Sequence, residues 1–452
     1  MKNLKWKKAG SAVLATALAG SMVLPATAYA QGEIVQLEGG TSTQTNTAPE
    51  QVFLNKYSGT VRTQNFNDNW KFYLGDASGA QTPAFDDSSW DQVNLPHDYS
   101  IDQKYNRSMD GESGYLPGGT GWYRKSFTVD KSLEGKRISI DFGGVYMNAT
   151  IYVNGKKLGT HPYGYTPFSF DITDNVKFGK ENVIAVKVDH QTPSSRFYSG
   201  SGIYRDVDFV VTDTVHVDKN GTKIETPDLK EHVDGNNVAV KVKTTVVNES
   251  ERDASVKVKH TIYPKNGTAE QAVATFESQE AVAVEKGKSK DVSADFTASG
   301  VQLWSTTTPN LYTVKTEVLM DGATVDTYET DYGFRYFAFD KNNGFTLNGQ
   351  KMKLQGVCMH HDQGALGSVA NDRSTERQVE ILKMMGCNSI RVTHNPASDE
   401  LIDACNKHGI LVIDEAFDGW VAPKNGNSND YAKWFNKEIE SDNEIMGAAD
   451  NM

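Results

Sequence analysis

Residues 388–415 read NSIRVTHNPASDELIDACNKHGILVIDE, and this stretch decides the fold of the C-terminal part of the chain. It predicts a strand over 388–393, a helix over 398–407 and a second strand over 410–413. The second strand (ILVI) is apolar without interruption, as is typical of a buried strand in a parallel sheet. Strand, helix and strand in this order indicate an α/β domain.

A hairpin precedes this unit. The dipeptide Asn348-Gly349 accepts positive φ at both positions and therefore predicts a tight turn. The turn joins a strand over 345–347 to a strand over 351–357. The second of these is expected to continue into the α/β region as its first strand.

A further helix is predicted over 374–385 (STERQVEILKMM), with Ser374 as its N-cap and Gly386 just beyond its end. The order is then strand, helix, strand, helix, strand. A complete (β/α)₈ barrel requires about 250 residues and eight strands, far more than is present here. The sequence therefore predicts either an incomplete TIM barrel or a different small α/β unit, followed by a polar helix over 429–452.

The chain before this region is predicted to be all β. Strict alternation at 137–142 (RISIDF) and a tight turn at Asn154-Gly155 indicate short antiparallel strands, as in a jelly-roll sandwich. The long alternating run 237–248 and a second hairpin turn at Asp321-Gly322 favour an immunoglobulin-like sandwich without the usual disulfide.

The N-terminus has the pattern of a secretory signal peptide: lysines, an apolar segment over 9–24 and a small-residue cleavage site at Ala28-Tyr29-Ala30. An uncleaved membrane anchor is the alternative, and no transmembrane span is expected after it. A secreted or cell-surface location follows. The predicted division is 1–30 signal peptide, 31–54 flexible leader, 55–211 jelly-roll domain, 212–333 immunoglobulin-like sandwich and 334–452 first part of the barrel.

Composition excludes other classes. With 46 Lys+Arg against 58 Asp+Glu, the net charge is −12, which argues against a nucleic-acid partner. The three cysteines Cys358, Cys387 and Cys405 are too few and too clustered for a disulfide scaffold. They are expected to be buried, small apolar residues.

Polar side chains follow each of the three predicted parallel strands. The clusters are Cys358-Met359-His360-His361-Asp362, Arg391-Val392-Thr393-His394-Asn395-Pro396 and Asp414-Glu415-Ala416-Phe417-Asp418. Because the carboxyl ends of parallel strands meet at one rim, we expect these side chains to converge where α/β barrels carry their active sites. For His394 a structural role is an equal alternative, and Arg391 either pairs with a structural carboxylate or orients a catalytic one. A metal site using His360, His361 and Asp362 with Asp414 or Glu415 is the weaker alternative, since no metal-binding motif is present.

Several motifs together carry a resemblance to a known family. They are NLPHDY (94–99), GGTGWYR (118–124), SGSGIYRDV (199–207), WSTTTPNLY (304–312), GFR (333–335), LQGVC (354–358), NSIRVTHNP (388–396) and DEA (414–416). In this order they resemble glycoside hydrolase family 2, which includes β-galactosidases, β-glucuronidases and β-mannosidases. The resemblance implies a multidomain fold with a sugar-binding jelly roll, an immunoglobulin-like β-sandwich and a catalytic (β/α)₈ TIM barrel.

The family retains anomeric configuration by means of two glutamates about 5 Å apart. The resemblance places them after the fourth and seventh barrel strands, beyond Met452, so no catalytic residue is expected in this chain and the chain alone is expected to be inactive. The residues that the resemblance assigns to substrate binding are His394, His360, His361, Asp98 and Asn395. Those that it assigns to supporting the site are Arg391, Asp414 and Glu415.

The His-Asn-Pro form of the second cluster looks more like the β-galactosidase branch. The substrate implied is a β-galactoside oligosaccharide or glycan, and a homo-oligomer is left open. The segment 417–420 (FDGW) lacks the magnesium-binding Glu of the best-known β-galactosidases, so no cofactor is assigned, with Mg or Na left open. The alternatives are a β-glucuronidase or another β-glycosidase of the family, or a non-catalytic carbohydrate-binding fragment.

Overall fold

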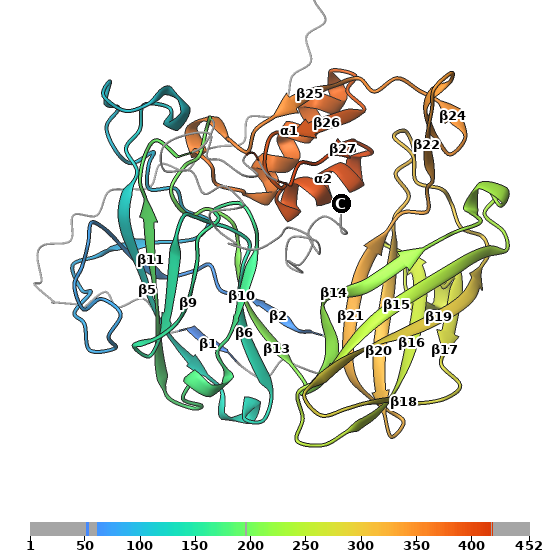
Figure 1. Cartoon of the computed structure of the whole chain (residues 1–452), viewed down its shortest axis with the longest axis horizontal. Coiled ribbons are helices and arrows are strands. Elements are labelled where there is room, and N and C mark those ends of the chain that lie inside the picture. The colour runs from blue at the N-terminus through green and yellow to red at the C-terminus, as the bar shows by residue number, and fades with distance from the viewer. Residues whose placement is uncertain (1–50, 54–60, 195–196, 417, 419–452) are drawn as a thin grey trace, which may run out of the picture. The chain divides into compact units, whose positions relative to one another are not determined.

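The structure is a computed structural model that describes residues 51–53, 61–194, 197–416 and 418. The predicted signal peptide, most of the predicted leader and the helix predicted over 429–452 lie outside these residues. Figure 1 colours the described chain from a blue and green β region, through a yellow-green one, to an orange and red α/β segment. Within the described residues, no helix is long and apolar enough to span a membrane.

The N-terminal β region is a sandwich of two main sheets, as predicted for a jelly roll. The larger sheet has the order β4 (Asp91–Val93), β3 (Trp70–Leu74), β5 (Gly119–Val129), β11 (Glu181–His190), β8 (Ala149–Val153), β9 (Lys156–His161), with β1 (Gln51–Phe53) beside β5. The second has the order β10 (Phe168–Asp171), β6 (Arg137–Phe142), β13 (Val207–Thr212), β2 (Thr63–Asn65), and β12 (Gly202–Ile203) pairs with β7 (Val145–Tyr146). Strict alternation of buried residues along β6 confirms the predicted period of two.

Aromatic side chains form the centre of this sandwich. Phe66 contacts Trp70 and Phe127 edge-on, at centroid distances of 5.6 and 5.3 Å. Burial of each such ring stabilises the fold by about 1.5–3 kcal/mol. The predicted hairpin turn is confirmed, since Asn154 and Gly155 have φ values of 49° and 84°.

One boundary of the predicted leader is wrong. Residues Gln51–Phe53 are not part of a flexible segment but form β1, which pairs in parallel with Phe127–Val129 of β5. A strand of only three residues shows no pattern along the sequence, and its partner lies more than seventy residues later in the chain.

The second β region is a sandwich of a three-stranded and a five-stranded sheet. The first has the order β14 (Val215–Glu225), β15 (Val238–Asn248), β19 (Lys288–Ala298). The second has the order β17 (Ala274–Glu277), β16 (Ala254–Pro264), β20 (Tyr312–Met320), β21 (Ala323–Tyr332), with β18 (Val282–Val284) beside β16. Asp321 and Gly322 have φ values of 52° and 81°, which confirms the second predicted hairpin turn.

A small antiparallel sheet of β22 (Phe337–Asp340), β23 (Gly344–Leu347) and β24 (Gln350–Lys351) leads into the α/β segment. The continuous strand predicted over 351–357 is wrong, because β24 ends at Lys351 and the parallel strand β25 (Gly356–Met359) begins only at Gly356. Asn388 spans the break: its side chain accepts from Gln355 N at 2.8 Å and donates to Lys353 O at 2.8 Å. These bonds replace the ladder where the chain changes sheets.

The α/β segment contains three parallel strands in the order β25, β26 (Ser389–Val392), β27 (Leu411–Ile413), with helices α1 (Asp372–Met384) and α2 (Asp399–His408). Val379 of α1, Leu401 of α2 and Ile390 of β26 share one core. This arrangement confirms the start of a barrel. Of the predicted ILVI strand, Ile413 is 50% exposed, so the run is not buried on both faces.

The predicted N-cap of α1 is also wrong. Asn371 caps the helix, its side chain accepting from Ser374 N at 3.2 Å, while Ser374 lies inside the first turn. Helix α2 lies within one residue of the predicted range at each end: Ser398 is its N-cap rather than its first residue, and Gly409 follows its last residue at φ 71°.

Candidate functional site

The carboxyl ends of β25, β26 and β27 meet around the side chain of Glu415. Arg391 Nε donates to Glu415 Oε1 at 2.6 Å, and Arg391 Nη2 contacts the same oxygen. His394 Nδ1 lies 3.1 Å from the other oxygen, Oε2. The ring of His360, just after β25, meets the ring of His394 edge-on at 5.5 Å. The three strand ends therefore converge as the sequence predicts, and we call this cluster of His360, Arg391, His394 and Glu415 the rim.

The rim is open to solvent. The side chain of Arg391 is 42% exposed, and those of His394 and Glu415 are each 25% exposed. Because Nδ1 of His394 lies against a carboxylate, we assign the ring proton to Nδ1, which leaves Nε2, on the far side of the ring, as an acceptor. An ion pair beside an imidazole acceptor suits a ligand rich in hydroxyl groups.

Asp414 directly follows β27 and bonds to the backbone near the rim. Its Oδ1 accepts from the backbone N–H groups of Ala397 at 3.2 Å and Glu415 at 3.0 Å. Burial raises the pKa of this carboxyl group above its ordinary value. Asp414 thus ties the end of β27 to the turn that follows β26.

His361 and Asn395 face the N-terminal sandwich rather than the rim. His361 Nε2 lies 3.2 Å from Ser199 O, and burial lowers the pKa of His361 to about 3, so the ring is neutral and donates this bond. Asn395 is buried, and its Oδ1 accepts from Tyr163 Oη at 2.5 Å. Their assignment to substrate binding remains a prediction, and the contacts seen here are structural.

Asp98 does not lie at the rim. Its side chain is buried, and its carboxylate accepts from Ser100 N, Ser201 N, Tyr198 Oη and both the N and Oγ of Ser368, all between 2.8 and 3.1 Å. A carboxylate with five donors in a buried position is not available to a sugar. We therefore correct its predicted role: Asp98 joins the N-terminal sandwich to the loop before α1.

The comparisons with known proteins agree with this geometry. Residues 63–213, 222–335 and 340–451 match, in turn, the sugar-binding domain of glycosyl hydrolases family 2, glycosyl hydrolases family 2 itself and the TIM barrel domain of that family. The chain belongs to glycoside hydrolase family 2. The resemblance found in the sequence motifs is thereby confirmed.

Individual family 2 relatives differ in their named substrates. A β-galactosidase of Bacteroides ovatus is 43% identical over 380 residues, which cover 83% of this chain and 43% of that protein. A putative β-glucuronidase of Formosa agariphila is 35% identical over 381 residues, covering 83% of this chain and 35% of that protein. A solved family 2 structure from Bacteroides cellulosilyticus has a TM-score of 0.80 at 38% identity and covers 86% of this chain and 50% of that one. The chain thus spans less than half the length of these two curated relatives.

Two features of this family 2 chain were not predicted from the sequence: the exposure of two cysteines and the contacts of Arg205. Cys358 is exposed rather than buried, and its Sγ lies 3.7 Å from Arg391 Nη1. Cys387 is half-buried, and only Cys405 is buried as predicted. Arg205, in the motif SGSGIYRDV, is buried and bonds to the chain just after His394, a role that its sequence position alone did not indicate.

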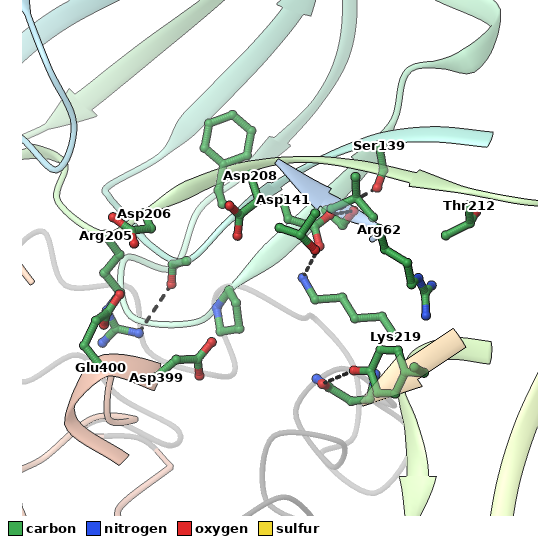
Figure 2. Close-up of a pocket in the computed structure, with 18 of the residues that line it drawn as sticks. Arg62, Ser139, Asp141, Arg205, Asp206, Asp208, Thr212, Lys219, Asp399 and Glu400 are labelled. Atoms are coloured by element: carbon green, nitrogen blue, oxygen red, sulfur yellow. Dashed lines mark hydrogen bonds and ion pairs between the residues drawn. The ribbon is translucent and has the colours of Figure 1, made fainter. Parts of the chain in front are cut away.

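A large acidic cleft lies elsewhere in the family 2 chain, with a volume of 980 Å³ (Figure 2). Arg205, Asp206, Asp399 and Glu400 lie at one end, and Arg62, Asp141 and Lys219 at the other. Burial raises the pKa of Glu400 to about 7 and that of Asp208 to about 6. None of the eight predicted site residues is among the described residues that line this cleft.

Side chains that could bind a cation gather in the cleft and on the two helices. Within the described residues, two groups place their ligand atoms within 4.8 Å of one another: Asp206, Asp372 and Glu400 in the cleft, and Glu376, Glu380 and His408 on the helices. At the rim both oxygens of Glu415 already have partners. Neither of the two groups includes a residue of the rim.

Proposed function

We propose that this chain supplies the sugar-binding domain, the immunoglobulin-like domain and the first part of the barrel of a retaining exo-β-glycosidase that removes terminal β-galactose. The rim supports this proposal, because Arg391, His394 and Glu415 meet at the carboxyl ends of three parallel strands, where α/β barrels carry their active sites. The resemblance assigns no catalytic glutamate to the described residues.

In this proposal the described residues bind and orient the sugar rather than break its bond. His394 Nε2 accepts a hydrogen bond from a sugar hydroxyl while its Nδ1–H remains on Glu415. Arg391 holds Glu415 in one orientation by two contacts to the same oxygen. Such fixed geometry lowers the cost of orienting the substrate before reaction.

Two observations favour galactose over glucuronic acid. The β-galactosidase relative is 43% identical, against 35% for the putative β-glucuronidase. In addition, the guanidinium of Arg391 already forms an ion pair with Glu415. Among the described residues of the rim, Arg391 is therefore not an unpaired cation that could bind the carboxylate of a uronic acid. A β-glucuronidase is the second candidate, because several relatives of this chain carry that name.

The test is hydrolysis of aryl β-glycosides by the complete gene product. We expect p-nitrophenyl β-galactoside to be hydrolysed with kcat/KM at least about a hundredfold above that for p-nitrophenyl β-glucuronide. The reverse order would establish the second candidate. Inertness toward every aryl β-glycoside, combined with retention on a galactose affinity column, would instead establish a carbohydrate-binding protein without hydrolytic activity.

We also propose secretion after cleavage behind Ala30, supported by the lysine-rich and apolar N-terminal sequence. N-terminal sequencing of protein collected outside the cytoplasm is expected to begin at Gln31. An intact Met1 in that material would contradict cleavage.

A further inference from the structure

The turn His394-Asn395-Pro396-Ala397 connects β26 to α2 and carries the histidine of the rim. On the barrel side it is fixed at two points. His394 Nδ1 lies 3.1 Å from Glu415 Oε2, and Ala397 N donates to Asp414 Oδ1 at 3.2 Å. The position of the His394 ring therefore depends on how this turn is held.

On its other side the turn is held by the sugar-binding domain. Tyr163 Oη donates to Asn395 Oδ1 at 2.5 Å. Arg205 Nη2 donates to Pro396 O at 2.9 Å, and its Nη1 reaches Ala397 O at 3.4 Å. Three consecutive residues of the turn are thus bonded to a different domain.

The two side chains that make these bonds are themselves fixed. Tyr163 and Arg205 are 5% and 3% exposed. Arg205 Nη1 also donates to Tyr165 O at 3.0 Å, and its guanidinium lies 5.2 Å from the centroid of the Tyr204 ring. A buried guanidinium with several carbonyl acceptors has little freedom to move.

We propose that Tyr163 and Arg205 are positioning residues, through which the sugar-binding domain fixes the 394–397 turn and so sets the His394 ring against Glu415. The catalytic consequence rests on the proposed glycosidase function, but the positioning itself does not. Removing the Tyr163 hydroxyl leaves Asn395 Oδ1 buried without this donor, and the turn relaxes to find another. A small displacement of a substrate-binding side chain is enough to slow a reaction severely.

The first test observes His394 directly in the 452-residue chain. Imidazole ¹⁵N and ¹H signals are recorded on histidine-labelled protein, with His394→Gln used to assign the His394 signals. We expect Tyr163→Phe to shift or broaden the signals of His394. Tyr99→Phe is the matched control, because Tyr99 is also a buried tyrosine whose hydroxyl donates within the sugar-binding domain, to Gly119 O at 2.7 Å.

Identical His394 signals in Tyr163→Phe and the unchanged chain would overturn the proposal, as would equal shifts in Tyr163→Phe and Tyr99→Phe. Should Tyr163→Phe fail to fold, Asn395→Ala removes the same hydrogen bond from the barrel side. It is expected to move the same His394 signals, and unchanged signals there would equally overturn the proposal.

The second test measures kinetics on the complete gene product. Tyr163→Phe is expected to lower kcat/KM on the preferred aryl glycoside about tenfold, mostly through kcat, while Tyr99→Phe changes it less than twofold at a similar loss of thermal stability. Equal kcat/KM for the two variants would overturn the proposal. If the unchanged protein hydrolyses no aryl glycoside, the proposed function fails, and the His394 signals alone still decide the positioning role.

Discussion

At Glu415, a guanidinium and an imidazole share one carboxylate, and each occupies its own oxygen. The pair is partly exposed, so its contribution to stability is small, on the order of 0–1 kcal/mol. We expect these contacts to act mainly by orienting the side chains of Arg391 and His394. Because they contribute little to stability, a substitution at Glu415 is expected to lower activity without unfolding the chain.

We expect Glu415→Gln to change the free energy of unfolding by less than about 1 kcal/mol and to lower kcat/KM of the complete gene product more than about tenfold. Glu376→Gln is the control, because Glu376 also holds a cation and a histidine, Lys407 and His408, but lies away from the rim. Urea unfolding and aryl glycoside kinetics measure both. An equal loss of activity in Glu376→Gln and Glu415→Gln would contradict a specific role of Glu415 at the rim.

At the scale of elements, helix α1 begins at a different residue from the one that the sequence indicates. Both Asn371 and Ser374 are good N-cap residues, and the pattern of apolar residues did not separate them. The tertiary structure did, because Asn371 lies at the junction of the loop with the helix, where its φ and ψ are extended.

Asn371→Ala is therefore expected to destabilise the chain by about 1 kcal/mol, since it removes the side-chain acceptor for Ser374 N. Ser374→Ala is expected to cost much less, because this serine lies within the helix. Urea denaturation midpoints of the two variants decide the matter. A larger loss of stability in Ser374→Ala than in Asn371→Ala would show that Ser374 is the N-cap after all.

At the scale of the whole molecule, the acidic cleft makes stability depend on pH. Burial raises the pKa of Glu400 from 4.5 to about 7. Between these values the folded chain binds more protons at this group than the unfolded chain, so the contribution of Glu400 to stability is largest below pH 4.5 and is lost as the pH rises from 4.5 to about 7.

Glu400→Gln is expected to raise stability at pH 8 by about 1 kcal/mol or more and to change it least near pH 4, below the unfolded pKa of the carboxyl group. Thermal unfolding of both proteins from about pH 4 to pH 8 measures this difference. Glu231→Gln, which removes an exposed carboxylate, is the control. A Glu400→Gln curve parallel to that of the unchanged chain would contradict the prediction.

Features that depend on near neighbours along the chain could be predicted from the sequence. Asn154-Gly155, Asp321-Gly322 and Asn348-Gly349 form tight turns because these residue types accept positive φ wherever they occur. Alternation and helical periodicity located most strands and both helices, and three polar strand ends predicted the rim, because parallel strands end at one edge.

Which polar side chains face solvent and which join domains depends on the folded arrangement of distant segments. Asp98 is bonded to Ser368, and Tyr163 to Asn395, across 270 and 232 residues of sequence. Such partners leave no periodic signal, because burial of a side chain depends on which distant segment covers it. For the same reason Cys358 is exposed while Cys405 is buried, although the two residues look alike in the sequence.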